Sequence, residues 1–303
     1  MTLIAIILVV ISAFMHAGWN LLSKSQRPST GFFLIASLSG ALMLSPALVV
    51  YHDTVTHYIP ARVWILLLAT SFFMALYYAC LAGAYRAGDM SVAYPLARSS
   101  PVIVVSFVTL MLGCGDQVSG LCVAGIVLIV GGCFLIPLQR FGDMHLRNYM
   151  NATCALALLA AVGTSGYSIL DDEALRQLRT NARVTIGNTQ VTLLYACLEA
   201  WAASLWLTIF VAVRQKSRTA LRQLLRGNTR NAVLTGGVIR LTYVVVLVSL
   251  AFVSNVSYVV GFRQLSIPLG AIAGILVLKE APHAPRLVGV TIMFIGLMLV
   301  AMG

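Results

Sequence analysis

The chain has 303 residues, of which 60% are hydrophobic and only 10% are charged. Together with a mean hydropathy of +0.93, this composition excludes an ordinary water-soluble protein and predicts one that crosses a membrane several times. In a soluble chain the net charge of +11 would point to nucleic acid. Here the distribution of the charge gives it a topological meaning, and we predict no nucleic-acid partner.

Ten apolar runs follow one another along the chain, and each approaches the roughly 20 residues that a transmembrane helix needs. The first run has no basic residue before it, so we predict a retained helix and not a signal peptide. No polar loop separates the eighth run from the ninth. The predicted helices span about residues 2–22, 31–51, 62–85, 90–112, 118–138, 149–170, 190–213, 232–253, 255–278 and 286–302.

Basic residues collect in the loops that follow the odd-numbered predicted helices, and six of them lie between residues 214 and 230. With the acidic residues counted, these loops carry about +10 and the opposite loops about zero. Under the positive-inside rule the basic face is cytoplasmic, which places both termini outside. The segment from Arg214 to Arg230 carries leucines on one side and is predicted to form a short interfacial helix.

An acidic residue followed at the same spacings by two glycines closes each half of the chain. Five helices per copy would insert the second copy upside down, because the number is odd. We therefore predict an all-α polytopic membrane protein with ten transmembrane helices in two inverted five-helix repeats, residues 1–147 and 148–303. The two copies of the motif are Asp116, Gly125, Gly132 and Glu280, Gly289, Gly296.

Three ionisable residues lie well inside predicted helices: Arg98, Glu199 and Arg240. A charge near the bilayer centre costs at least about 2.5 kcal/mol, so such residues face a bundle interior or a water-filled cavity. Arg98 stands between Pro95 and Pro101, each of which removes a backbone donor and loosens the helix. We predict that Arg98 lies on a substrate pathway and recognises an anion. A purely structural clamp is the alternative.

Glu199 and Arg240 fall on consecutive antiparallel helices, where they can come within reach of one another. One interpretation is a permanent ion pair that locks the two helices together. The other is that Glu199 takes up and releases a proton while substrate competes for Arg240. The second interpretation predicts a proton-coupled carrier.

Aromatic and amide side chains near helix midpoints complete the predicted binding site. Such side chains combine an apolar face with a polar tip, which suits an amphiphilic metabolite. The alternative is that tyrosines and tryptophans anchor the helices at the membrane interface. Beside Arg98 and Arg240, the predicted pocket residues are Trp19, Asn20, Tyr94, Tyr167, Tyr243, Asn255 and Tyr258.

Pro95, Pro101 and Pro268, with the glycines around them, are predicted hinges. Gly270 and Gly274 form a GxxxG step, which we interpret as helix packing and not as a dimer contact, so a monomer is favoured. The six cysteines and five histidines are scattered, and neither GxxxxGK nor HExxH occurs. We therefore predict no metal, no cofactor and no enzymatic activity.

Four stretches resemble the EamA-type carriers of the drug/metabolite transporter superfamily, and together they extend over nearly the whole chain. Asp116 departs from the family, which commonly has a glutamate there. The stretches are HAGWN at residues 16–20, AYRAGDMSVAYPLARSSPV at 84–102, GYSILD at 166–171 and GFRQLSIPLGAIAGILVLKE at 261–280.

The resemblance implies a ten-helix carrier with a central cavity between four helices of each half. Such carriers move small metabolites, amino acids or drugs, often outward, and the resemblance implies no particular substrate. It also implies that both termini lie in the cytoplasm. The charge count indicates the reverse, and both orientations stay open.

The leading hypothesis is a secondary transporter of the cell inner (plasma) membrane. It would export or exchange a small polar or anionic metabolite, amino acid or drug by alternating access, with proton coupling through Glu199. Its partners would be the small-molecule substrate and membrane lipid. The alternative is a non-transporting membrane scaffold or lipid-binding subunit, in which the buried charges pair with one another and no solvated cavity exists.

Overall fold

The computed structural model describes residues 3–26, 28–111, 119–143, 145, 149–250 and 265–302. These residues form helices joined by short connections, with no strand among them, which confirms the predicted all-α class. The helices are α1 (Leu3–Ser25), α2 (Thr30–Leu44), α3 (Pro46–Val50), the π-helix η1 (Thr54–Tyr58), α4 (Ala61–Ala87), α5 (Met90–Met111), α6 (Gly120–Leu135), α7 (Ala152–Thr180), α8 (Asn188–Val213), α9 (Gln215–Arg226), α10 (Arg230–Leu250), α12 (Ser266–Leu276) and α13 (Ala284–Met302).

Several of these helices have the length and apolar composition of transmembrane helices. Within the described residues, five are long and apolar enough to cross a bilayer: most of α1, α2 continued by α3, α4, α7 and α8. Shorter apolar helices occur at residues 120–135, 266–276 and 284–300. Large apolar side chains cover the outside, such as Ile65 (69% exposed) and Leu276 (73% exposed). These features identify an integral membrane protein.

Every one of the ten predicted ranges contains a helix. The ninth does so only in its second half, because residues 251–264 lie outside the described residues. The count of ten spans and their inverted-repeat arrangement stay predictions.

Polar residues mark where several helices begin. Ser29 before α2, Ser119 before α6 and Asn151 before α7 each accept a hydrogen bond from the backbone amide three residues later, at 2.9–3.1 Å. Such caps satisfy amides that have no partner inside the helix. Pro46 begins α3 directly after α2 ends, so the second predicted span is interrupted at this point.

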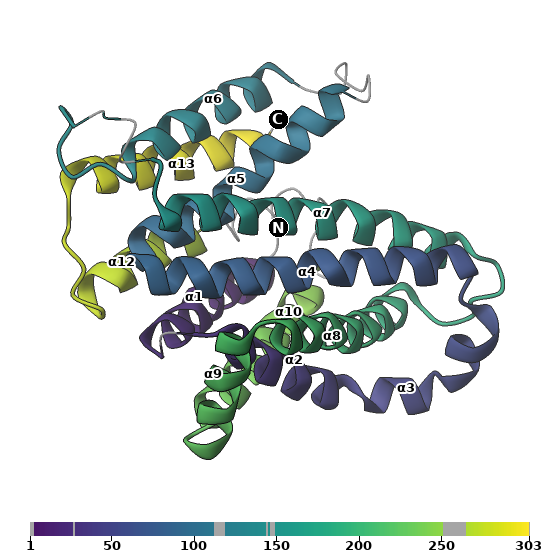
Figure 1. Ribbon diagram of the computed structural model, residues 1–303. Helices are drawn as coiled ribbons and strands as arrows, with labels where there is room; N and C mark the ends of the chain where they lie inside the picture. Colours follow the sequence, from purple (N-terminus) through teal and green to yellow (C-terminus); the bar gives the residue numbers. More distant parts are fainter. Residues whose placement is uncertain are drawn as a thin grey trace.

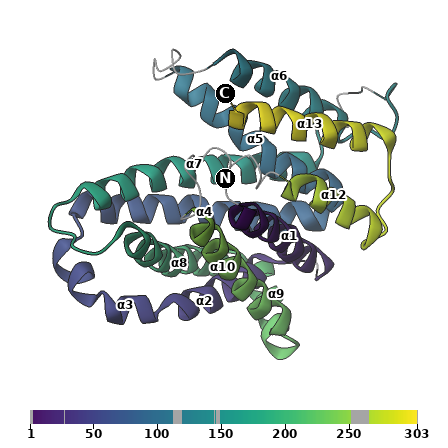
Figure 2. The ribbon, with the colours of Figure 1, turned by 180° about the vertical axis from the view of Figure 1, so that it is seen from behind.

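The two halves of the chain interleave. In Figures 1 and 2 the long helices α4 and α7 run side by side, although one comes from each half. Helix α4 also contacts α8, and α1 lies against α10 and α12. Helix α2 packs between α8 and α10, while α5 contacts α7 and α12. The pair α6 and α13 forms a separate layer at the top of Figure 1.

Glycines let α6 and α13 approach to backbone contact. A Cβ at Gly125 would stand 2.5 Å from the carbonyl oxygen of Gly296, and one at Gly132 would stand 2.7 Å from that of Gly289. In the other direction, a Cβ at Gly296 would stand 2.6 Å from the carbonyl oxygen of Gly125, and one at Gly289 would stand 2.9 Å from that of Gly132. These four glycines are those of the repeated acidic-glycine-glycine motif, so the equal spacing in its two copies has a packing reason.

The pair Gly131 and Gly132 tests this contact. A Cβ at Gly132 meets backbone atoms of α13, whereas a Cβ at Gly131 meets nothing within 4 Å. We expect Gly132→Ala to cost about 1–3 kcal/mol through overpacking. Gly131→Ala should be neutral or gain up to about 1 kcal/mol from helix propensity. Thermal unfolding of the purified variants in detergent measures both, and equal midpoints for the two variants would contradict the close packing.

Candidate functional site

A cavity of about 370 Å³ lies between α1, α4, α5, α7, α8 and α10. This volume falls within the range of small-molecule sites, roughly 300–1,000 Å³. Charged and hydroxyl-bearing side chains share its wall with aromatic ones. The lining residues are His16, Trp19, Met74, Tyr77, Tyr78, Arg98, Thr164, Tyr167, Ser168, Asp171, Leu175, Tyr195, Ala196, Glu199, Ile239, Arg240, Thr242 and Tyr243.

Arg98 enters the cavity from α5, between the two prolines of that helix. The helix continues through both of them, and the hydroxyl of Ser165 on α7 donates to the carbonyl of Pro101 at 3.4 Å. The buried Nε of Arg98 has no hydrogen-bond partner among the described residues. A buried donor of this kind is costly unless an acceptor comes to it.

Arg240 enters from α10 and is only 6% exposed. Its side chain crosses Gly40 of α2 so closely that a Cβ at Gly40 would stand 2.8 Å from its Cγ and Nε. Ion pairs within 4.0 Å in the described part of the chain involve His52, Arg62, Arg176 and Arg286, and neither cavity arginine is among them. Among the described residues, two cations thus line one cavity without a carboxylate in ion-pair distance.

Two carboxylates line the same cavity. Asp171 on α7 is held through Oδ1, which accepts from the hydroxyl of Thr70 at 2.6 Å and from that of Tyr195 at 2.8 Å. Glu199 on α8 is 6% exposed, and its Oε1 has no hydrogen-bond partner among the described residues. Glu199 and Arg240 therefore share the cavity, but they are not in ion-pair contact.

Aromatic rings form the apolar part of the wall. Trp19 is buried, and its Nε1 donates to Nδ1 of His16 at 3.3 Å. Behind it, Tyr78 stacks on Phe33 with ring centres 5.0 Å apart. Tyr77 meets Tyr167 edge to face at 6.1 Å. A buried position in this wall argues that Trp19 is part of the cavity and not an interfacial anchor.

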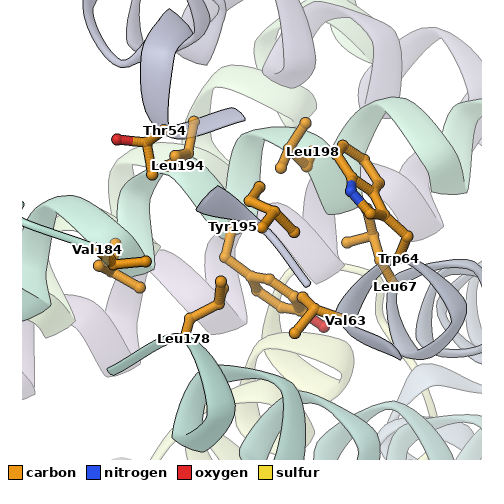
Figure 3. Close-up of a pocket in the computed structure, with 11 residues that line it drawn as sticks. Thr54, Val63, Trp64, Leu67, Leu178, Val184, Leu194, Tyr195 and Leu198 are labelled. Atoms are coloured by element: carbon orange, nitrogen blue, oxygen red, sulfur yellow. The ribbon is translucent and has the colours of Figure 1, made fainter. Parts of the chain in front are cut away.

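Tyr195 connects the cavity to a small apolar pocket of about 10 Å³ between η1, α4, α7 and α8 (Figure 3). Its ring lies between Leu178 and Val63 in that pocket, whereas its hydroxyl donates to Asp171. A space of this size holds no more than about one water molecule. We interpret the apolar side chains around this space as packing that holds the ring of Tyr195 in place. Tyr195 in turn holds Asp171 through its hydroxyl.

The structure brings together most of the residues that the sequence predicted. Arg98, Arg240, Glu199, Trp19, Tyr167 and Tyr243 all line the cavity. Tyr94 lines a small adjoining pocket with Arg98 and packs against Gly270 of α12. Pro95 and Pro101 lie inside α5 and Pro268 inside α12. Tyr258 and Asn255 lie outside the described residues.

Asn20 does not line the cavity. Its side chain accepts from the hydroxyl of Tyr85 at 2.7 Å and donates to the carbonyl of His16 at 2.8 Å. Both contacts are buried or partly buried. The bond to Tyr85 ties α1 to α4, whereas the bond to His16 lies within α1 and fixes the amide. In this structure the amide is a helix clamp next to the cavity.

Sequence reasoning missed Asp171, Tyr77, Tyr78 and Tyr195. The sixth predicted span ended at residue 170, but α7 continues to Thr180 and carries Asp171 into the cavity. The missed signal is a polar stripe at helical spacing, formed on α7 by Thr164, Tyr167, Ser168 and Asp171. Polar side chains at such spacing inside an apolar helix share one face.

A polar cluster joins the two halves at the end of the bundle where α5 begins. The carboxylate of Glu280 accepts hydrogen bonds from the backbone amides of Met90 at 2.6 Å and Ser91 at 2.8 Å. Arg286 donates to Asp89 at 3.1 Å and to the hydroxyl of Ser91 at 2.8 Å. A carboxylate at a helix N-terminus satisfies free amides and matches the helix dipole. We therefore interpret Glu280 as a structural residue that caps α5.

Fold and site together define a helical integral membrane protein with a charged and aromatic internal cavity of small-molecule size. Residues 3–138 match the EamA-like transporter family. The resemblance to EamA-type carriers of the drug/metabolite transporter superfamily is thereby confirmed over the first half of the chain. This is a family of membrane transporters, which agrees with the expected transport function.

Eleven chains of solved structures match this one. One of them, described as "Crystal structure of protein", is 17% identical, with 96% of this chain and 94% of that chain covered and a TM-score of 0.50. At this identity the likeness concerns the fold alone, but it extends over both halves. No curated protein sequence matches the chain.

Glu280→Ala tests the polar cluster. Met90 and Ser91 are fully buried, so removing their acceptor leaves two buried amides unsatisfied. We expect a loss of about 2–3 kcal/mol, measured as a fall of several degrees in the unfolding temperature of the purified protein. As the control, Glu173→Ala removes a carboxylate that pairs with Arg176 at the surface, where little stability is lost. Equal effects of the two substitutions would contradict a capping role for Glu280.

Proposed function

We propose that the protein is a secondary transporter of the plasma membrane that exports a small polar or anionic metabolite, amino acid or drug. The observation that carries this proposal is the cavity of about 370 Å³ with Arg98 and Arg240 in its wall. Neither arginine is in an ion pair within the described residues. Guanidinium groups suit carboxylate and phosphate because they present several donors in a fixed plane. The aromatic wall would hold the apolar part of the same molecule.

Inverted five-helix repeats, residues 1–147 and 148–303, are part of the proposal. In the two repeats α1 corresponds to α7 and α4 corresponds to α10. The contact between α1 and α10 therefore has its counterpart in the contact between α7 and α4, and both occur. In the same way, the contact of α1 with α12 corresponds to that of α7 with α5. The contact of α2 with α10 corresponds to that of α8 with α4, and all four contacts occur. The glycine contact of residue 125 with residue 296 becomes that of 289 with 132. A two-fold relation between the halves accounts for all of these correspondences.

Alternating access needs ends that open and close in turn. The cluster of Glu280, Arg286 and Asp89 bridges the halves at one end of the bundle, and it is the candidate for a contact that breaks when that end opens. The hinges proposed beside it are Pro95 and Pro101 in α5 and Pro268 in α12. Prolines lack the amide that would tie each helix turn to the one before it.

Proton coupling is proposed for Glu199, with Asp171 as a second carboxylate in the same cavity. Two carboxylates in one poorly solvated cavity repel each other, so a proton shared between them is favourable. A proton taken up there would weaken the attraction of Glu199 for Arg240 and leave the arginine available to an anionic substrate.

A non-transporting scaffold or lipid-binding subunit is the rival function. It requires that the buried charges satisfy one another. Arg98, Arg240 and Glu199 are in no mutual ion pair in the described structure, and this observation favours the transporter.

Profiling of released metabolites tests the proposed transport. Cells that express the intact chain should release at least one metabolite into the medium that cells expressing Arg98→Ala or Arg240→Ala do not release. Arg183→Ala, an exposed arginine outside the cavity, is the matched control and should behave like the intact chain. All variants must be present in the membrane at equal levels. Identical profiles for all four would contradict an export function that depends on these arginines.

The pH dependence of transport tests the coupling. In vesicles, Glu199→Gln should abolish the response of substrate uptake to an imposed pH gradient, because the amide cannot exchange a proton. Asp171→Asn should reduce the response, whereas Asp172→Asn should leave it unchanged, because Asp172 is exposed and does not line the cavity. A response to the gradient that persists in Glu199→Gln would exclude this residue as the coupling site.

A further inference from the structure

Helix α9 (Gln215–Arg226) is set apart from the long helices by its orientation. In Figures 1 and 2 it projects from the bundle and crosses the direction of α4, α7 and α8 steeply. It follows α8 and precedes α10, at the end of the bundle where the basic loops lie. A helix that runs across the membrane-spanning direction at this end runs along the membrane surface.

One side of α9 is fixed on the bundle. Leu221 sits so close to α2 that a Cβ at Gly31 would stand 3.0 Å from its Cβ and 3.2 Å from its Cα. Leu221 and Leu224 both pack against the buried core. This contact fixes the rotation of α9 about its own axis, and it decides which side chains face outward.

The outward side of α9 carries uncompensated positive charge. Arg218, Arg222 and Arg226 follow one another at intervals of four residues, so their side chains lie along one face of the helix and repel one another. Within the described residues, none of the six cations of this segment is in an ion pair. All six are exposed: Arg214, Lys216, Arg218, Arg222, Arg226 and Arg230.

Apolar groups accompany these charges at the same surface. Leu225 on α9 is 56% exposed, and Val213 at the end of α8 is 78% exposed. Exposed leucine and valine beside a row of arginines match the layered chemistry of a lipid leaflet, where phosphates lie directly above hydrocarbon. A soluble anion would explain the arginines but not the apolar residues next to them.

We infer that α9 is a binding surface for the phosphate headgroups of anionic phospholipids in the leaflet at the basic face. Arginine side chains would contact the phosphates, and Leu225 with Val213 would contact the acyl chains below them. Each cation near an anionic leaflet raises the affinity about fivefold. The three arginines of the stripe together correspond to roughly a 100-fold change in affinity.

Lipid titration of the purified full-length protein tests this inference. The thermal unfolding midpoint in detergent is followed as phosphatidylglycerol or phosphatidylcholine with the same acyl chains is added. We expect only phosphatidylglycerol to raise the midpoint, because a ligand that binds the folded state stabilises it. High salt should remove the effect. Use of purified protein keeps membrane insertion and orientation out of the comparison.

Matched charge-removal variants make the test specific. In the triple substitution Arg218→Gln, Arg222→Gln and Arg226→Gln, the apparent affinity for phosphatidylglycerol should fall at least about tenfold. The control Arg62→Gln, Arg176→Gln and Arg183→Gln removes the same charge from exposed sites at the opposite end and should keep the affinity. If the triple variant does not fold, Arg222→Gln alone should show a smaller shift in the same direction.

Two results would overturn the inference. Equal stabilisation of the triple variant and the intact chain by phosphatidylglycerol would show that α9 is not the binding surface. Equal stabilisation of the intact chain by soluble glycerol phosphate, lost in the triple variant, would show that the surface binds a soluble anion and has no preference for lipid.

Discussion

The cost of a charge in hydrocarbon controls how this protein is built. At about 2.5 kcal/mol or more for each arginine or carboxylate at the bilayer centre, such residues cannot face lipid. Arg98, Asp171, Glu199 and Arg240 accordingly come from α5, α7, α8 and α10 and meet at one internal cavity. The outer surface of α7, α8 and α10 exposes leucine, isoleucine and valine. Because charged side chains must avoid lipid, they collect at the cavity wall, and apolar side chains are left on the surface that faces the membrane.

Hydrophobic burial does not hold such helices together, because lipid is as apolar as the side chains that would be buried. Close packing and hydrogen bonds between helices take its place. The glycines between α6 and α13 bring two backbones into contact. Elsewhere the hydroxyl of Ser204 donates to that of Ser37 at 3.0 Å, and Tyr85 donates to Asn20 at 2.7 Å. Gly40 serves the site itself, because it leaves the space through which Arg240 reaches the cavity.

The positions of the helices could be predicted from the sequence more completely than the residues of the site. Each range that was predicted from composition and run length contains a helix. The prediction succeeds because a transmembrane span must be apolar along its whole length. Arg98, Glu199 and Arg240 stood out because charge within an apolar run is costly. Asp171 did not, because a rule based on apolar length ended its helix ten residues early. Asn20 was assigned to the cavity although it points to Tyr85, since sequence does not fix the rotation of a helix against its neighbours.

The charge balance of the cavity gives a physical reason for coupling. Two arginines and two carboxylates sum to zero when all four are ionised. An anion that binds to the arginines would leave a net negative charge in a poorly solvated site, which is unfavourable. Uptake of one proton by Glu199 or Asp171 restores neutrality, so binding of an anion and of a proton would favour each other. Reciprocity requires that each raise the affinity of the other by the same factor. A carrier with this cavity would thus gain coupling from electrostatic neutrality, without any contact between substrate and carboxylate.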